Sequence, residues 1–300
     1  MTGPEPAVEH YRQIIERGSR SFARAASLLE PRVRAGGYQL YAWCRHCDDL
    51  IDGQVLGHLP ADSPPPDPDR QRAQLAELRA LTTQALAGQP SSDPAFQGLA
   101  RIFEQHAIPR HHPFELLDGM AMDVELRRYR NIDELIVYCY YVAGVVGVMM
   151  AHIIGIRDPA TLKRAEDLGI AMQLTNIARD VMDDARGGRV YLPLDWLSEA
   201  GVDPEQVRSV EHRHRIATVV KRLLAVAETR YQRADQGIAH LPFRSAWSIA
   251  AARSIYADIG RVIVARGEQA WDRRAMVPAW RKYLLVAASL ARTMGRTIRP

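Results

Sequence analysis

The stretch from Gln173 to Asp184, QLTNIARDVMDD, constrains the fold of this chain more than any other. Residues at i, i+3 and i+4 share one face of an α-helix. Wound as a helix, the stretch has a single polar stripe, formed by Gln173, Asn176, Asp180 and Asp184. The other faces carry apolar residues such as Leu174 and Ile177, so the helix must be mostly buried, with its two aspartates inside a cavity. Because unpaired carboxylates are costly to bury, the pattern predicts a cation bound beside the two aspartates.

A second polar stripe occurs in the segment YAWCRHCDDLID. On a helix its polar residues share one face: Tyr41, Arg45, Asp48 and Asp52. The neighbouring faces are apolar, with Trp43 and Ile51. Two such helices, facing each other across a cavity, can hold divalent cations between their carboxylates. Mg²⁺ is typically bound by one or two carboxylates together with the phosphates of a substrate, and it allows an acidic site to accept an anionic diphosphate.

Each acidic stripe, taken alone, has a purely structural interpretation as an ion-pair network with nearby arginines. The two stripes together, both on largely apolar helices, favour the metal site instead. Arg45 and Arg179 lie on the same two helices, where a guanidinium can supply forked donors to phosphate oxygens. The pair of stripes therefore predicts a site that binds a diphosphate through metal ions.

Helical periodicity dominates the rest of the chain, and Pro and Gly residues mark the ends of the predicted helices. Helices are predicted at 8–29 with an interruption at 18–22, 31–52, 70–87, 94–107, 113–127, 135–156, 159–186, 211–239, 243–270 and 278–296. The segment 189–197 is predicted to be extended or a turn, because Pro193 excludes a regular helix there. The Pro-rich segment 57–69 is predicted to be an exposed loop. No alternating strand pattern and no GxGxxG motif occurs. The chain is therefore predicted to be all-α, with residues 1–300 in a single domain of long helices around a central cavity.

The segment from Leu135 to Ile156 contains no charged residue and is long enough to span a membrane. Tyrosines near its start, His152 near its end and internal glycines argue against a span, as does the lack of a Lys/Arg cluster at one flank. A helix that is hydrophobic all round is also what a large helical protein buries at its centre. We therefore expect a buried helix and no transmembrane span.

The composition is that of an ordinary soluble globule, with 47% hydrophobic and 25% charged residues and a net charge of +4. This charge balance demands neither a nucleic acid nor an acidic membrane as a partner. The cysteines are Cys44, Cys47 and Cys139, an odd number that suits a reducing cytoplasm. Cys44 and Cys47 lack a second pair for zinc, so a structural role is expected. The first residues, MTGPEPAVEHYRQ, have no apolar core and predict no signal peptide; a cytoplasmic protein is expected.

The stripes and their flanks, YAWCRHCDDLID and LTNIARDVMDDARGGRVYLP, resemble the two aspartate-rich motifs of the squalene and phytoene synthase family. The resemblance runs from HYRQIIERGSRSF through RSAWSIAAARSIYADIG to AWDRR, and it implies the class I isoprenoid synthase fold. The implied metal ligands are Asp48, Asp52, Asn176, Asp180 and Asp184. The implied contacts with substrate are Ser19, Arg20, Ser21, Phe22, Tyr41, Arg45, Gln173, Arg179, Tyr191, Tyr256 and Arg273. Four of the aspartates and Tyr138 are the implied catalytic residues: Asp48, Asp52, Asp180, Asp184 and Tyr138.

The match assigns no clear side-chain role to Gly18 and leaves two possible roles for the tyrosines. Some relatives have histidine where this chain has Gly18, so no side-chain role is assigned there. The tyrosines, including Tyr138, Tyr191 and Tyr256, could also have a purely structural role. A tyrosine beside an apolar helix usually packs its ring and hydrogen-bonds its hydroxyl to the backbone.

The resemblance implies the head-to-head condensation of two geranylgeranyl diphosphates, through prephytoene diphosphate, to phytoene. Mg²⁺ is the implied cofactor, Mn²⁺ could substitute, and no NADPH is expected. Two alternatives remain: squalene or dehydrosqualene synthesis from farnesyl diphosphate, and a non-catalytic scaffold, although all five ligand positions are intact. A C40 hydrocarbon is insoluble in water, so we expect peripheral attachment to a membrane surface, where a downstream carotenoid enzyme could take the product.

Overall fold

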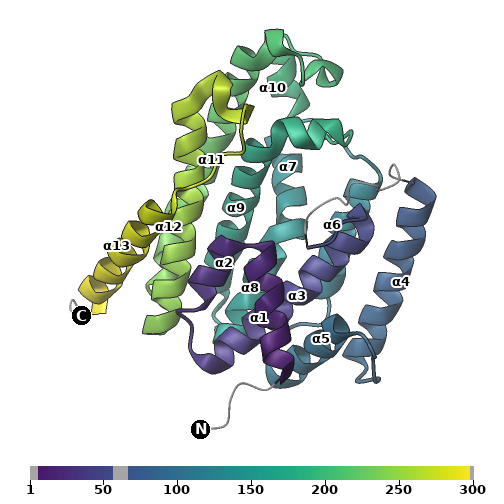
Figure 1. The fold of residues 1–300 in the computed structure, drawn as a ribbon, viewed down its shortest axis with the longest axis vertical. Helices are drawn as coiled ribbons and strands as arrows, with labels where there is room; N and C mark the ends of the chain where they lie inside the picture. Colours follow the sequence, from purple (N-terminus) through teal and green to yellow (C-terminus); the bar gives the residue numbers. More distant parts are fainter. Residues whose placement is uncertain (1–5, 57–66, 298–300) are drawn as a thin grey trace.

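The computed structural model describes residues 6–56 and 67–297, without the side chains of residues 6, 7, 20, 296 and 297. Its regular elements are all helices (Figure 1). They are α1 (Pro6–Gly18), α2 (Arg20–Ala26), α3 (Pro31–Asp52), α4 (Pro68–Leu86), α5 (Pro94–Gln105), α6 (His112–Val124), α7 (Ile132–Cys139), η1 (Tyr140–Gly144), α8 (Val145–Ile154), α9 (Pro159–Arg186), α10 (Leu194–Glu199), η2 (Pro204–Gln206), η3 (Val210–His212), α11 (Arg213–Ile238), α12 (Phe243–Arg266), η4 (Gly267–Trp271) and α13 (Ala279–Thr297). The predicted all-α class is confirmed.

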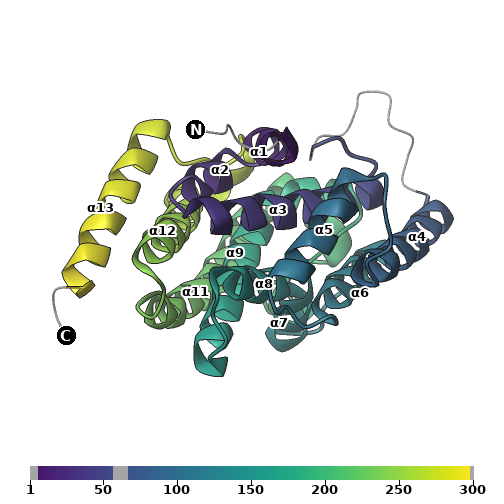
Figure 2. The same cartoon turned by 90° about the horizontal axis from the view of Figure 1, so that it is seen from below.

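Helix α9 runs through the middle of the bundle in both ribbon views (Figures 1 and 2). It packs most extensively on α11 and also contacts α7, α8, α12 and η4. One hydrophobic core surrounds α9, α11 and α12, with Leu174, Leu223 and Ile255 fully buried. A second core lies between α3, α5, α6 and α8, with Trp43 and Leu99 fully buried. The two helices that carry the polar stripes therefore belong to different cores.

Glycines let α8 and its preceding turn approach α9 closely. A Cβ on Gly169 would lie 2.3 Å from the carbonyl oxygen of Ala143, and a Cβ on Gly147 would lie 2.4 Å from that of Ala165. Both distances are far below van der Waals contact, so only glycine permits this crossing. The crossing fixes the central helix against the wall of the bundle.

The uncharged segment predicted as one buried helix is in fact three consecutive helical pieces, α7, η1 and α8. The middle piece is a π-helical turn at Tyr140–Gly144, a feature that often occurs at functional sites. The stretch Ile132–Ile154 has the length and composition of a membrane span, yet half of its most apolar window is buried inside the protein. Several of its less buried residues, such as Val142, Val146 and Met150, line an internal cavity. These features favour the predicted core helix.

Two predicted non-helical segments were too long, both because a helix begins at or just after a proline. The Pro-rich loop was expected to extend to Asp69, but Pro68 and Asp69 already belong to α4, where the Asp67 side chain caps the first turn. Residues 57–66 of that loop lie outside the described residues. The segment 189–197 is extended only to Pro193, after which α10 begins at Leu194.

Candidate functional site

A cavity of about 340 Å³ lies between the two predicted helices. Its lining on α9 consists of Thr161, Arg164, Ala165, Leu168, Gly169, Met172, Gln173 and Asn176. These positions follow i, i+3, i+4 spacing and form a single stripe. At a rise of 1.5 Å per residue the stripe is about 22 Å long. It begins at Thr161 and Arg164, is apolar from Ala165 to Met172 and ends in the polar pair Gln173 and Asn176. The cavity is therefore elongated, and the end formed by Gln173 and Asn176 is its polar end beside Asp48.

Helix α3 faces the same cavity with an equivalent stripe of Gly37, Leu40, Tyr41, Cys44, Arg45 and Asp48. This stripe also changes from apolar to polar toward the C-terminal end of its helix. Asp48 and Asn176, from opposite walls, therefore meet at the polar end of one cavity. The structure brings together the two stripes that the sequence predicted to face each other.

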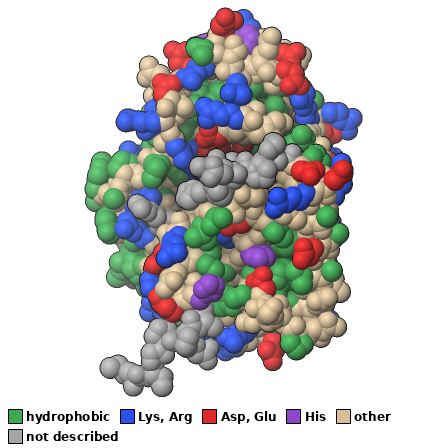
Figure 3. All heavy atoms as spheres, turned by 45° about the vertical axis from the view of Figure 1, so that its right-hand side comes forward, with side chains coloured by type: hydrophobic (Ala, Val, Ile, Leu, Met, Phe, Trp, Pro, Cys, Tyr) green, Lys and Arg blue, Asp and Glu red, His purple; other side chains and the backbone are tan. Residues whose placement is uncertain are grey.

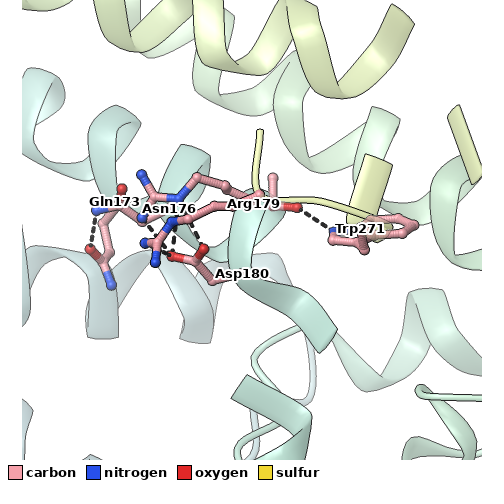
Figure 4. A network of polar contacts seen from close by, with 7 residues as sticks. Gln173, Asn176, Arg179, Asp180 and Trp271 are labelled. Carbon is pink, nitrogen blue, oxygen red and sulfur yellow. Dashed lines mark hydrogen bonds and ion pairs between the residues drawn. The ribbon is translucent and has the colours of Figure 1, made fainter. Parts of the chain in front are cut away.

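The aspartates beyond the cavity rim are held by arginines. The carboxylate of Asp52 lies 2.5 Å from Nη2 of Arg189, in the segment that follows α9. Asp180 contacts its neighbour Arg179 at 2.5 Å and Arg274 at 3.1 Å. Figure 4 shows this network on α9, together with Trp271, whose indole N–H donates to the carbonyl of Ala178 at 3.1 Å. The Trp271 bond ties η4 to the back of α9 and fixes the acidic face.

One buried atom at the polar end of the cavity, an oxygen of Asn176, has no hydrogen-bond partner among the described residues. The amide nitrogen of Asn176 donates to Oε1 of Gln173 at 3.2 Å. Its oxygen, Oδ1, is buried and accepts no hydrogen bond from the described residues. A buried acceptor without a donor costs on the order of 1–3 kcal/mol. An amide oxygen in this position is a suitable ligand for a hard divalent cation.

The aspartates around this atom repel one another. Burial, opposed by Arg45 and reinforced by Asp52, raises the pKa of Asp48 to about 7. Burial and the charge of Asp180 raise the pKa of Asp184 to about 8. A bound cation would reverse this local preference and favour the ionised forms. The oxygens of Asp48, Asp52, Asn176, Asp180 and Asp184 thus form a donor set that could hold a hard divalent cation.

Sequence reasoning missed a further acidic residue, Asp123 on α6. Its carboxylate accepts hydrogen bonds from the hydroxyls of Tyr138, at 2.9 Å, and Tyr191, at 2.7 Å. Burial raises the pKa of Asp123 to about 6, although nearby Arg189 lowers it, and the charge of Asp52 adds to the increase. Asp123 follows the buried positions Leu116 and Met120 at helical spacing, and an acid on a buried face is the signal that could have revealed it.

The tyrosines around Asp123 form an ordered aromatic group. The rings of Tyr138 and Tyr191 are stacked, with centroids 5.1 Å apart. Tyr129 packs against Tyr138 at 5.2 Å. Asp123 therefore fixes the hydroxyls of two predicted site residues, and α6 adds an acid close to those of α3 and α9.

The N-terminal segment covers the cavity from the side of α2. Phe22 packs its ring against Tyr256, at 5.1 Å between centroids, and against Tyr41, at 6.3 Å. The Ser19 hydroxyl accepts the N–H of Phe22 at 3.3 Å and caps α2. The Ser21 hydroxyl accepts a hydrogen bond from Lys282 at 3.0 Å. The side chain of Arg20 lies outside the described residues.

Tyr41 and Arg45 present buried polar atoms to the cavity. The hydroxyl of Tyr41 and the Nε of Arg45 have no hydrogen-bond partner within the described part of the chain. Arg45 lies 3.8 Å from Asp48 and 3.7 Å from Asp49. Gly18 lies directly against Tyr41, because a Cβ there would stand 2.5 Å from the Tyr41 hydroxyl. In this arrangement, a side chain at position 18 would require Tyr41 to move.

The remaining predicted residue, Arg273, is exposed, and its backbone carbonyl accepts a hydrogen bond from Arg266 at 3.1 Å. Its neighbour Arg274 is the one that reaches Asp180. The sequence match thus pointed to the correct loop, and the structure brings the adjacent arginine to the acids. Arg189 is a second basic residue of the site that sequence reasoning did not single out.

Acidic side chains are visible in a hollow near the middle of the face drawn in Figure 3, with basic side chains above them. The cysteines play no visible part in this polar end. Cys44 lines the cavity wall and Cys47 is fully buried. Burial raises the pKa of both thiols, which keeps them protonated and agrees with the expected structural role.

Comparison with known proteins decides the family. The family model for squalene/phytoene synthase matches residues 15–281. The chain belongs to this family. It is 43% identical over 292 residues to a 15-cis-phytoene synthase of Pantoea ananas, covering 97% of this chain and 94% of that protein. It is 49% identical over 263 residues to a 15-cis-phytoene synthase of a Paracoccus species, covering 87% of this chain and 84% of that protein.

Solved structures of the family have the same fold. A dehydrosqualene synthase crystallised with a ligand superposes with a TM-score of 0.85 and 27% identity, over 96% of this chain and 97% of that chain. A squalene synthase from Alicyclobacillus acidocaldarius superposes with a TM-score of 0.72 and 22% identity, over 88% and 94% of the two chains. The predicted family membership and isoprenoid synthase fold are therefore confirmed.

Proposed function

We propose that this protein is a 15-cis-phytoene synthase, which condenses two geranylgeranyl diphosphates head to head and needs Mg²⁺. One observation carries the proposal: Asp48 of α3 lines the polar end of one long cavity together with Gln173 and Asn176 of α9. The other aspartates of the two stripes, Asp52, Asp180 and Asp184, follow on the same helices. The cavity can accept a prenyl chain, while the acids receive its diphosphate through metal ions. The identity of 43–49% to phytoene synthases over most of the chain supports the product.

Each wall of the cavity has its own task in this proposal. Asp48, Asp52, Asn176, Asp180 and Asp184 hold Mg²⁺, which supplies positive charge to the departing diphosphate. Arg45 and Arg179 donate to phosphate oxygens from opposite sides. These donors favour cleavage of the carbon–oxygen bond, because they stabilise the charge that develops on the leaving group.

The apolar walls and the tyrosines serve the hydrocarbon half of the reaction. An allylic cation is quenched by water, and the apolar stripes of α3 and α9 exclude water from the chain. Phe22 and Tyr256 close the cavity near the polar end, where their rings face the reacting carbons. Tyr138 and Tyr191 are positioned by Asp123, which orients their hydroxyls toward it. Ser19, Arg20, Ser21, Gln173 and Arg273 are the remaining proposed substrate contacts.

The choice between a C20 and a C15 substrate depends on the far end of the cavity. Small residues keep this end open, among them Ala151 on α8 and Ala234 on α11. We expect Ala151→Phe to lower kcat/KM for geranylgeranyl diphosphate at least tenfold relative to farnesyl diphosphate, because the ring shortens the space for the longer chain. The two values are measured in competition. Ala80→Phe, the same change on the exposed side of α4, is the control, and equal losses with both substrates would contradict the role of Ala151.

The decisive assay supplies the purified protein with Mg²⁺ and either geranylgeranyl or farnesyl diphosphate, with and without NADPH. Phytoene from the longer substrate, formed equally without NADPH, is the expected result. Squalene or dehydrosqualene from farnesyl diphosphate alone would move the protein to the alternative that its structural neighbour represents. Metal binding without any product would favour a scaffold role.

The insolubility of phytoene suggests where the enzyme works. We propose a cytoplasmic protein that attaches peripherally to a membrane, releases its product there and passes it to a downstream carotenoid enzyme. Extraction of the protein from membranes by high salt and alkali, without detergent, tests peripheral attachment. A requirement for detergent would contradict it.

A further inference from the structure

Helix α13 presents a stripe of apolar residues to solvent. Trp280, Tyr283 and Leu284 are 63%, 60% and 61% exposed, and Met294 is 49% exposed. Ala287, Ala288 and Ala291 are exposed as well. These seven positions follow i, i+3 and i+4 spacing, so they form one continuous apolar stripe on the solvent side of the helix.

The side of α13 that faces the protein carries Leu285 and Val286, which pack against the core, together with polar side chains. Arg281 donates to the fully buried Asp258 of α12 at 2.7 Å. Lys282 donates to Ser21 of α2 at 3.0 Å. Ser289 lies 3.2 Å from Ser254, to which Arg292 donates at 2.8 Å. These hydrogen bonds and the packing of Leu285 and Val286 hold the helix in this orientation and leave the stripe exposed.

Helix α13 lies at the edge of the molecule, beyond α12, in both ribbon views (Figures 1 and 2). Its inner face contacts α12 and α2, and both of these helices line the cavity. Helix α12 contributes Ser248, Ile249 and Ala252 to the cavity wall, and α2 contributes Phe22, Ala25 and Ala26. The exposed stripe therefore runs beside the wall of the product cavity.

The charge and residue types identify what the stripe fits. Helix α13 contains the basic residues Arg281, Lys282, Arg292 and Arg296 and no acidic residue. Beside it, the guanidinium of Arg24 lies over the ring of Tyr283, 4.2 Å from its centroid. Tryptophan and tyrosine favour the boundary between lipid and water. Basic residues around an apolar stripe add attraction to anionic head groups.

We propose that the outer face of α13, formed by Trp280, Tyr283, Leu284, Ala287, Ala288, Ala291 and Met294, is the surface that inserts into an anionic lipid bilayer. The inference rests on the proposed peripheral attachment and assigns it to one helix. A second copy of the chain is the competing occupant. Arg24 and Arg292, whose contacts among the described residues are to neutral groups, lie beside the stripe. Their charge opposes a symmetric contact of the stripe with itself and complements an anionic membrane.

The test is flotation of the purified protein with vesicles of phosphatidylcholine, with and without phosphatidylglycerol. The wild type should bind the anionic vesicles, and binding should weaken severalfold when salt rises to about 0.5 M, as screening predicts. The variant Trp280→Ser/Leu284→Ser should bind at least tenfold more weakly. Val210→Ser, at a 75% exposed site on η3, is the matched control and should bind like the wild type.

Tryptophan fluorescence gives a second, local measurement. Trp43 and Trp196 are buried, Trp247 and Trp271 are partly buried, and Trp280 is the most exposed of the five tryptophans. Brominated phosphatidylcholine in the vesicles should therefore quench the wild type, and Trp280→Phe should remove most of this quenching. Equal quenching of both proteins would place the inserted surface elsewhere.

Each of the other possible results also tests whether the outer face of α13 binds the membrane. If the wild type does not float, or if the double variant floats equally well, the assignment is wrong. If sedimentation instead shows a dimer that the double variant loses, the occupant is a second copy. Flotation requires no substrate, and synthase activity in detergent should remain within about twofold of wild type in the double variant. A failed membrane assignment is thus distinguishable from a failed proposal of phytoene synthesis.

Discussion

At the scale of single residues, the site is built from groups that are unfavourable without a ligand. The amide oxygen of Asn176 is buried without a donor among the described residues, and the pKa of Asp184 is raised to about 8. A protein that only needed stability would replace such groups with apolar ones. Their grouping at the end of one cavity supports a binding role.

Neutralising one acid on each stripe tests the metal site. Asp48→Asn and Asp180→Asn should each reduce kcat roughly 10²–10³-fold, a loss similar to that of other electrostatic groups in active sites, because each removes a charge that serves the metal. Steady-state kinetics across a Mg²⁺ titration measure the effect. Asp183→Asn is the matched control, since Asp183 is exposed and pairs with Arg186 beside Asp184. Full activity with unchanged Mg²⁺ dependence in either site variant would refute the assignment.

Asp123 should behave as a positioning residue for two tyrosines. Asp123→Asn retains one acceptor oxygen where the carboxylate has two, so one of the hydroxyls of Tyr138 and Tyr191 loses its partner. We expect Asp123→Asn to lower kcat about 10–100-fold. Tyr191→Phe should then cost less activity in the Asp123→Asn variant than it does in the wild type, because the two residues act together. Asp118→Asn, on the same helix but paired with Arg79, serves as the control. Fully additive losses would show that Asp123 acts independently of the tyrosines.

At the scale of elements, the site depends on how closely α9 approaches its neighbours. The π-helical turn η1 and the glycines of α8 and α9 set this distance. The cavity occurs where the same helices carry small side chains facing α3. Packing in this region therefore controls both stability and the shape of the cavity.

Gly169→Ala tests the close crossing. Alanine favours a helix over glycine by about 0.5–1 kcal/mol, but here its Cβ meets the Ala143 carbonyl at 2.3 Å. Overpacking of this kind costs about 1–3 kcal/mol, so the substitution should lower the free energy of unfolding in urea. Gly295→Ala on α13 has open space around it and should stabilise the protein instead. A stabilising effect at Gly169 would show that α8 and α9 separate easily.

At the scale of the whole molecule, the buried acids link stability to pH. Asp48 and Asp184 have pKa values of about 7 and about 8 in the folded protein, against about 3.9 for an unfolded aspartate. Between these values the folded state binds more protons than the unfolded state, so stability falls as pH rises. Mg²⁺ binds the ionised form and should reverse the trend with release of protons.

Thermal unfolding checks this linkage. Without divalent metal, Tm should decrease by about 2–5 °C between pH 6 and pH 8, and Asp184→Asn should reduce the slope. Added Mg²⁺ should raise Tm more at pH 8 than at pH 6. A metal-free Tm that rises over this interval would contradict the raised pKa values.

The sequence by itself determined the helical class, most helix boundaries and the two polar stripes. It could do so because helical periodicity and proline positions are local properties. The stripes on α3 and α9 were readable for the same reason, since residues three and four apart must share a face. The start of α4 at Pro68 and of α10 at Leu194 were missed, because proline can end a loop as well as prevent a helix.

Only the tertiary structure decided which residues from distant segments meet. Asp123 joins Tyr138 and Tyr191 because α6 packs beside the segment after α9, a contact that no local pattern encodes. Arg274, and not Arg273, reaches Asp180 because η4 is tied to α9 by Trp271. The outward apolar stripe of α13 likewise depends on the contacts of its inner side, where Arg281 and Lys282 donate hydrogen bonds and Leu285 packs against the core. Periodicity shows that a helix has two faces, whereas packing alone decides which of them meets the protein.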